Sequence, residues 1–261
     1  MNGLSPLRAE PARHPIGRGW VWVRSGFDIF NKGMGVSVAM VLIWFAVGLL
    51  LDRLPAGGLI SQLLYMVWGA GWVVVAHRGY EGNEGNELKF ADFFAGFRNK
   101  LTPLMLGGLL VLALFTLIGL ICLGLLSMWG LTSLLTQDPE SMVVSVAQAQ
   151  GLLFCLLLGL ALLIPVLMAI TFAPALIYFH DMGILQAARL SFRGCLTNMW
   201  PFLWWGLITA GLMLFGAALM LIGLLVVIPA LNYSIYVAYR DIYLDVAQEA
   251  QSEAPLTGFE A

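Results

Sequence analysis

Five apolar tracts restrict what this chain can fold into. They cover residues 34–51, 57–76, 102–133, 151–179 and 199–239, and none of them contains Asp, Glu, Lys, Arg or His. A helix needs about 20 apolar residues to cross the roughly 30 Å hydrocarbon core of a bilayer, so each of the first four tracts predicts one crossing. The last tract would form about 60 Å of helix at 1.5 Å per residue. It therefore predicts two crossings, with a turn near residues 221–225.

The composition is typical of a membrane protein and argues against several other classes. Charged residues make up 11% of the chain and hydrophobic residues 60%, whereas soluble domains carry about 25% charged residues. The net charge of −2 does not favour nucleic-acid binding. Cys122, Cys155 and Cys195 lack the spacing of a metal site and are expected to be packing residues. We predict an all-α polytopic membrane protein with six transmembrane helices, and expect no metal, cofactor or nucleic acid.

The distribution of positive charge predicts the orientation of these crossings. Of the 13 lysines and arginines, all except Arg53 fall before the first crossing, between the second and third, between the fourth and fifth, or after the sixth. In a six-crossing topology these regions share one side of the membrane. Lys and Arg concentrate in cytoplasmic loops, so both termini are expected in the cytoplasm.

Three related amphipathic segments precede the first, third and fifth crossings. They contain "VRSGFDIF", "FFAGFRNK" and "ARLSFRGC", which align on Phe27, Phe97 and Phe192. The even-numbered crossings also end alike, in "VAHRGY", "YFHDMG" and "AYRDIY". The pattern predicts three pseudo-repeats over residues 17–80, 88–183 and 184–243, each an amphipathic helix followed by a helical hairpin. They form one domain (17–245) between a disordered tail (1–16) and a disordered acidic tail (246–261).

Each amphipathic segment has a predicted apolar face, and two interpretations of it are open. The faces carry Trp20, Val23, Phe27 and Phe30, then Phe90, Phe93, Phe94 and Phe97, then Ile184, Ala188, Phe192 and Cys195. In one interpretation they contact lipid in the cytoplasmic interface and point basic residues toward anionic head groups. In the other they only pack against the bundle. The candidate lipid-contact residues are Trp20, Phe27, Phe90, Phe93, Phe94, Phe97, Arg98, Arg189, Phe192 and Arg193.

The ends of the even-numbered crossings supply a candidate polar cluster. Threefold pseudo-symmetry would gather its members at one cytoplasmic mouth, with His180 as a ligand or proton carrier. The alternative is that the basic residues only anchor helix C-termini and the membrane interface. The members are His77, Arg78, His180, Asp181, Arg240 and Asp241.

Two passages carry a resemblance to a known group of proteins. "RGYEGNEGNELKFADFFAGF" and the terminal "YVAYRDIYLD" are similar to motifs of the YciC-like six-helix families, a group of uncharacterised bacterial inner-membrane proteins. Phe93 stands where the family pattern has Leu. The resemblance implies a bacterial inner-membrane location and supplies no reaction or ligand.

The sequence favours a non-enzymatic function. No nucleophile-elbow, zinc-protease, Walker or dinucleotide motif is present, and crossings without ionisable groups disfavour ion-coupled transport. We expect a scaffold, accessory or membrane-organising protein whose partner is the lipid bilayer; a membrane-protein partner and a homo-oligomer are both compatible with this. One alternative is a transporter or channel for a neutral or lipidic substrate, suggested by the repeats, glycines and helix-kinking prolines. The other is an intramembrane lipid enzyme that uses His180, Asp181 and Asp241.

Overall fold

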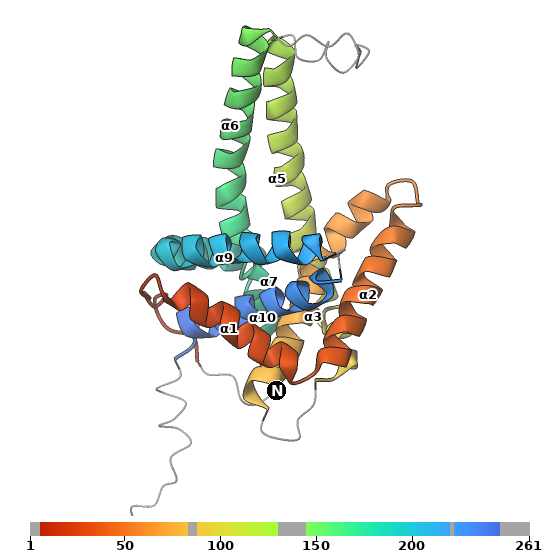
Figure 1. Cartoon of the computed structure of the whole chain (residues 1–261), viewed down its shortest axis with the longest axis vertical. Coiled ribbons are helices and arrows are strands. Elements are labelled where there is room, and N and C mark those ends of the chain that lie inside the picture. Colours follow the sequence, from red (N-terminus) through yellow and green to blue (C-terminus); the bar gives the residue numbers. More distant parts are fainter. Residues whose placement is uncertain (1–5, 83–87, 130–144, 220–221, 246–261) are drawn as a thin grey trace, which may run out of the picture.

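The computed structural model describes residues 6–82, 88–129, 145–219 and 222–245, and within these ranges the fold is all-α. Figure 1 shows α5 and α6 as a long hairpin, α9 running across its base, and α1 and α10 close to α9. The elements are α1 (Arg18–Asn31), α2 (Met34–Leu51), α3 (Gly57–Glu81), the 3₁₀ helix η1 (Phe90–Phe94), α4 (Ala95–Arg98), α5 (Leu101–Met128), α6 (Val146–Ile170), α7 (Ala173–His180), α8 (Ile184–Thr197), α9 (Met199–Ala218) and α10 (Leu224–Tyr243).

Five segments are long and apolar enough to cross a membrane. They are Met34–Leu51, Gly57–Glu81, Leu101–Met128, Val146–His180 and Met199–Ala218. The tract 199–239 does divide into two helices, α9 and α10, close to the predicted turn. However, α10 is not one of the five, because its second half carries tyrosines, Arg240 and Asp241. Part of the predicted third crossing, residues 130–133, lies outside the described residues.

A break separates α6 from α7 inside the fourth predicted crossing. Helix α6 ends at Ile170, and α7 begins at Ala173 with Pro174 in its first turn. A proline cannot donate a helical hydrogen bond, so this position suits a helix start. The side chain of Ser191 on α8 stabilises the break, because its Oγ accepts from Phe172 N at 3.0 Å and donates to Met168 O at 2.7 Å.

Small residues lie on the buried faces of α1 and α8. On α8 the buried positions are Ala187, Ser191, Gly194 and Cys195, so the face differs from the predicted one except at Cys195. On α1, Trp20 is 53% exposed. Trp22, outside the predicted face, is fully buried. The difference arises because close contact between helix backbones needs small side chains, whereas hydropathy selects large ones.

The aromatic segment before α5 is not the continuous α-helix that its spacing predicts. It begins as the 3₁₀ helix η1 and becomes α-helical only at Ala95. Phe93 is fully buried, with its ring centroid 4.9 Å from that of Trp68 and 5.1 Å from that of Trp72 on α3. Phe97 also contacts Trp68, at 4.8 Å. For Phe93, these contacts favour the interpretation in which the segment packs against the helix bundle.

Residues 6–16 run along the end of α10, although the sequence assigns them to a disordered tail. Arg8 N donates to Tyr243 O and Ala12 N to Ile242 O, both at 2.8 Å. The buried Asn198 binds the same segment, since its Oδ1 accepts from His14 N at 2.9 Å and its Nδ2 donates to Ala12 O at 2.8 Å. These partners lie far along the chain, so local composition does not indicate them. The remaining tail residues, 1–5 and 246–261, lie outside the described residues.

Candidate functional site: a buried polar cluster on α10

A column of four buried tyrosines follows one face of α10. Tyr233, Tyr236, Tyr239 and Tyr243 are each at most 2% exposed. Spacings of three and four residues place side chains on one helical face, and neighbouring rings in the last three tyrosines lie 5.9 Å apart. A buried tyrosine hydroxyl needs a hydrogen-bond partner, and each of these hydroxyls finds one on a different helix. The column therefore joins α10 to four other helices.

Two of these partners are the predicted histidines. The hydroxyl of Tyr236 lies 2.8 Å from His77 Nδ1 on α3, and that of Tyr239 lies 2.5 Å from His180 Nε2 on α7. Tyr233 makes the equivalent contact with Ser37 Oγ on α2, at 2.8 Å. The Tyr243 hydroxyl donates to Leu190 O on α8, at 3.1 Å. The two histidines thus reach α10 one helical turn apart.

Glu81 extends the cluster toward the end of α3. Its carboxylate lies 3.4 Å from His77 Nδ1 and 3.9 Å from Arg240 Nε. The guanidinium of Arg240 also lies over the ring of Tyr80, at 4.4 Å from its centroid, a geometry that favours a cation. The half-buried His77, His180 and Arg240 therefore lie together along the tyrosine column.

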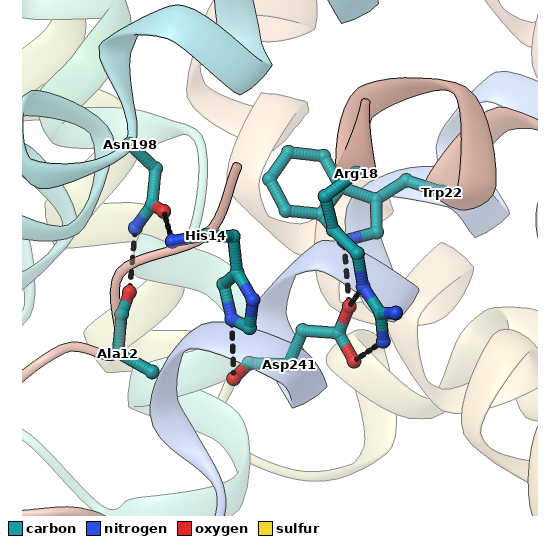
Figure 2. A network of polar contacts seen from close by, with 6 residues as sticks. All are labelled: Ala12, His14, Arg18, Trp22, Asn198 and Asp241. Carbon is teal, nitrogen blue, oxygen red and sulfur yellow. Dashed lines mark hydrogen bonds and ion pairs between the residues drawn. The ribbon is translucent and has the colours of Figure 1, made fainter. Parts of the chain in front are cut away.

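The carboxylate of Asp241 binds α1, and Figure 2 shows it beside Arg18 and Trp22. Its carboxylate accepts from Arg18 Nε at 2.6 Å, from Arg18 Nη2 at 3.1 Å and from Trp22 Nε1 at 2.7 Å. The hydrogen bond to Asp241 raises the pKa of Arg18. A bidentate arginine–carboxylate pair with a third donor fixes the angle between two helices. Asp241 thus positions α1 on α10.

The other two predicted members also diverge from the histidines. Arg78 forms an ion pair with Asp92 in η1, and Asp181 forms one with Lys100 at the start of α5. The predicted six-residue cluster is therefore divided. Three members lie at the tyrosine column, and the other three each bind a residue in or next to an amphipathic segment.

Sequence reasoning missed the tyrosine column itself. The signal is visible in "NYSIYVAYRDIY", where tyrosines recur at helical spacing. It is hidden by the apolar character of the tract, since a tyrosine in such a tract is also expected at the membrane interface. Only the packing shows that all four hydroxyls face inward.

The candidate lipid-contact residues differ in how deeply they are buried. Phe93 is buried. Half-buried positions are Phe27, Phe90, Phe94, Phe97 and Phe192, and exposed positions are Trp20, Arg98, Arg189 and Arg193.

The cluster is a network of hydrogen bonds and ion pairs. Its histidines, carboxylates and arginines contact one another or tyrosine hydroxyls, and no group of three His, Cys, Asp or Glu side chains arranged for a metal occurs within the described part of the chain. Such satisfied networks make a buried arrangement unique, because leaving one member unpaired is costly.

The apolar helices and this internal polar network define a multi-pass membrane protein. The chain is similar to a protein of Burkholderia thailandensis described as a probable inner membrane protein, with 25% identity over 250 residues that cover 86% of this chain and 90% of the relative. This relative and the five apolar helices support an inner-membrane location. No family model matches the chain, and no solved structure matches it, so the YciC-like resemblance stays a prediction.

Proposed function

We propose that this chain is a non-enzymatic scaffold or membrane-organising protein of the inner membrane. Its working surface is the set of exposed residues on the three amphipathic segments, α1, η1–α4 and α8. The observation that carries the proposal is that these segments are packed on other helices of the fold and still expose basic side chains, which on α1 and α8 lie beside exposed tryptophan or leucine side chains.

Contacts between the segments support the predicted three repeats. Helix α1 packs on α10, η1–α4 on α3, and α8 on α6 and α7, so each segment rests on the final helices of another repeat. Gly26 and Gly96 occupy aligned positions, and a Cβ at either one would overlap a backbone oxygen, of Ala230 and Val67 respectively. Both receiving residues lie eight positions before the aligned span-end motifs. The alignment of the amphipathic segments and the alignment of the span-end motifs are thus consistent with the same pair of contacts.

The exposed faces have the character of interfacial helices. Leu185, Arg189, Arg193 and Leu196 are all exposed and recur at helical spacing along α8. On α1, Trp20 and Arg24 are exposed in the same way. Arginine with tryptophan or leucine at the surface suits a helix that lies among anionic head groups. This favours anionic lipid, alone or with a membrane-protein partner, as what the surface binds.

The proposed topology has six crossings with both termini in the cytoplasm, and α10 as the sixth. The exposed side chains of Leu54, Lys89 and Ile222 test it. In a variant whose three native cysteines are replaced by serine, we expect a membrane-impermeant maleimide to label Leu54→Cys and Ile222→Cys in intact spheroplasts. Lys89→Cys should react only after permeabilisation. Labelling of Ile222→Cys only after permeabilisation would show that α9 and α10 do not form two crossings.

The function is tested by extracting the tagged protein in native-lipid particles. We expect anionic lipid to be enriched in the particles and a stoichiometric partner protein to be present, and the double variant Arg189→Glu/Arg193→Glu to reduce both several-fold. Arg53→Glu, on the opposite side of the proposed topology, is the matched control and should retain both. Mass spectrometry of lipids and proteins gives the readout. If the particles contain neither enriched anionic lipid nor a stoichiometric partner, the proposal is wrong.

A transporter or channel for a neutral or lipidic substrate remains the second candidate function. The observation that favours it is a cavity of about 420 Å³ between α2, α3, α6 and α10. Flux across reconstituted vesicles distinguishes it, since a scaffold should leave the vesicles tight to a panel of neutral solutes and lipids. The enzyme alternative receives less support, because His180, Asp181 and Asp241 each bind a different element.

A further inference from the structure

The cavity between α2, α3, α6 and α10 has a mainly apolar lining. Trp44 and Phe45 from α2, Trp68 and Trp72 from α3, and Ile228 from α10 are among its walls. Its volume of about 420 Å³ lies within the usual range of about 300–1,000 Å³ for ligand sites. The site is separate from the polar cluster on α10, and the proposed scaffold function does not use it.

The cavity is elongated and has the length of one bilayer leaflet. Its lining on α3 extends from Ser61 to Val73, which corresponds to about 18 Å of helix. Half of the hydrocarbon core is about 15 Å thick. Phe45 and Tyr65 line the cavity and are 59% and 47% exposed. Because α2 and α3 are candidate membrane crossings, the medium beside these exposed walls is lipid.

Thr171 after α6 and Asn232 on α10 line the cavity beside its apolar walls, and three more polar side chains lie at one end. Asp52, Ser61 and Tyr65 line the part of the cavity nearest the turn between α2 and α3. The Ser61 hydroxyl oxygen is buried and has no hydrogen-bond partner among the described residues. A buried hydroxyl without a partner is unfavourable by about 1–3 kcal/mol, so this oxygen marks a place where a bound polar group would be stabilised. The carboxylate of Asp52 matches a cationic head group at the same end.

We propose that this cavity binds one acyl chain of a phospholipid whose head group carries an ammonium. The chain lies along α3 between the tryptophans, and the ester and head-group region lies at Ser61 and Asp52. In the proposed topology this lipid belongs to the leaflet on the Arg53 side.

Gly48 allows the cavity to be filled without disturbing the backbone. It lines the cavity, and a Cβ at Gly48 would meet no atom of the described residues within 4 Å. Gly35 lies on the same helix, does not line the cavity, and is equally open within the described structure. The variant Gly48→Trp therefore has Gly35→Trp as its matched control, and Gly48→Leu is a milder second variant.

The test uses the full chain in vesicles of phosphatidylethanolamine and phosphatidylglycerol with a small fraction of phosphatidylethanolamine that has a photoreactive acyl chain. After illumination, we expect crosslinks at Trp44, Trp68 and Trp72 to exceed those at Leu214 on α9, which is 74% exposed. Gly48→Trp should reduce the cavity crosslinks at least fivefold and leave those at Leu214 unchanged. Gly48→Leu should reduce them partially, and Gly35→Trp should change neither.

Two results would overturn this proposal. One is cavity crosslinking that stays at wild-type level in both Gly48 variants, which would indicate ordinary contact with bulk lipid. The other is an Ile228→Cys variant that reacts with a polar, membrane-impermeant maleimide while no photolipid labels the cavity, which would indicate a water-filled space. Either result leaves the scaffold proposal intact, because that proposal depends on α1, η1–α4 and α8.

Discussion

Replacing Gly26 by leucine is expected to lower the thermal unfolding midpoint of the purified protein by about 6–12 °C. The side chain would overlap the Ala230 carbonyl oxygen, and its Cβ would lie 2.9 Å from Ser234 N. Both contacts are with the backbone of α10, which cannot rotate away as a side chain can. Forcing atoms into a packed interface is unfavourable by about 3 kcal/mol, and each kcal/mol corresponds to about 2–4 °C for a domain of this size.

The matched control for this experiment is Gly35→Leu on α2. A Cβ at Gly35 meets no described atom within 4 Å, so its midpoint should stay within about 2 °C of the wild-type value. Differential scanning fluorimetry in detergent or lipid particles makes the comparison, because tryptophans are distributed through the fold. Equal midpoints for Gly26→Leu and Gly35→Leu would contradict the close packing of α1 on α10.

Substituting Asp241 by alanine is expected to destabilise the fold by about 2–3 kcal/mol. It removes the acceptor for the buried Trp22 Nε1–H, and a buried donor left without a partner is unfavourable by about 1–3 kcal/mol. The contribution from Arg18 is smaller, because 40% of its side chain is exposed and water can replace the carboxylate. The expected decrease in the unfolding midpoint is about 4–12 °C.

A double-mutant cycle separates these two contributions. Arg18→Ala combined with Asp241→Ala should destabilise the protein by less than the sum of the single variants, because both remove one ion pair. Trp22→Phe combined with Asp241→Ala tests the indole hydrogen bond in the same way. Asp28→Ala, on the exposed surface of α1, is the control and should change stability by less than about 0.5 kcal/mol. Additive effects for both pairs would show that Asp241 does not bind α1.

Much of the layout follows from local properties of the chain. Hydropathy is summed residue by residue, so the apolar tracts predict where α2, α3, α5, α6 and α9 lie. The division of residues 199–239 near position 221 follows from helix length and bilayer thickness in the same way. The amphipathic segments are also found at their predicted places, since charged and apolar residues alternate there whatever they contact.

The candidate site was predicted only in part, for a reason visible in its residues. His77, His180 and Arg240 do lie at the tyrosine column, and they hold the same position in the three aligned span-end motifs. The residue that follows each of these in its motif points toward a partner on another segment. Asp241 binds Arg18, whereas Arg78 binds Asp92. Local sequence patterns do not indicate which residue each side chain binds, because each partner belongs to a different segment.

The sequence by itself determined an all-α membrane protein, the positions of its apolar helices and the uneven distribution of its positive charge. The tertiary structure alone decided which faces are buried, which residues the tyrosines of α10 bind, and that residues 6–16 lie against its end. The physical reason is that hydropathy acts along the chain, whereas close packing depends on the shape of the opposite surface. Gly26 and Ser191 are buried because the backbone of another helix lies against them. The polarity of these two residues does not predict that burial.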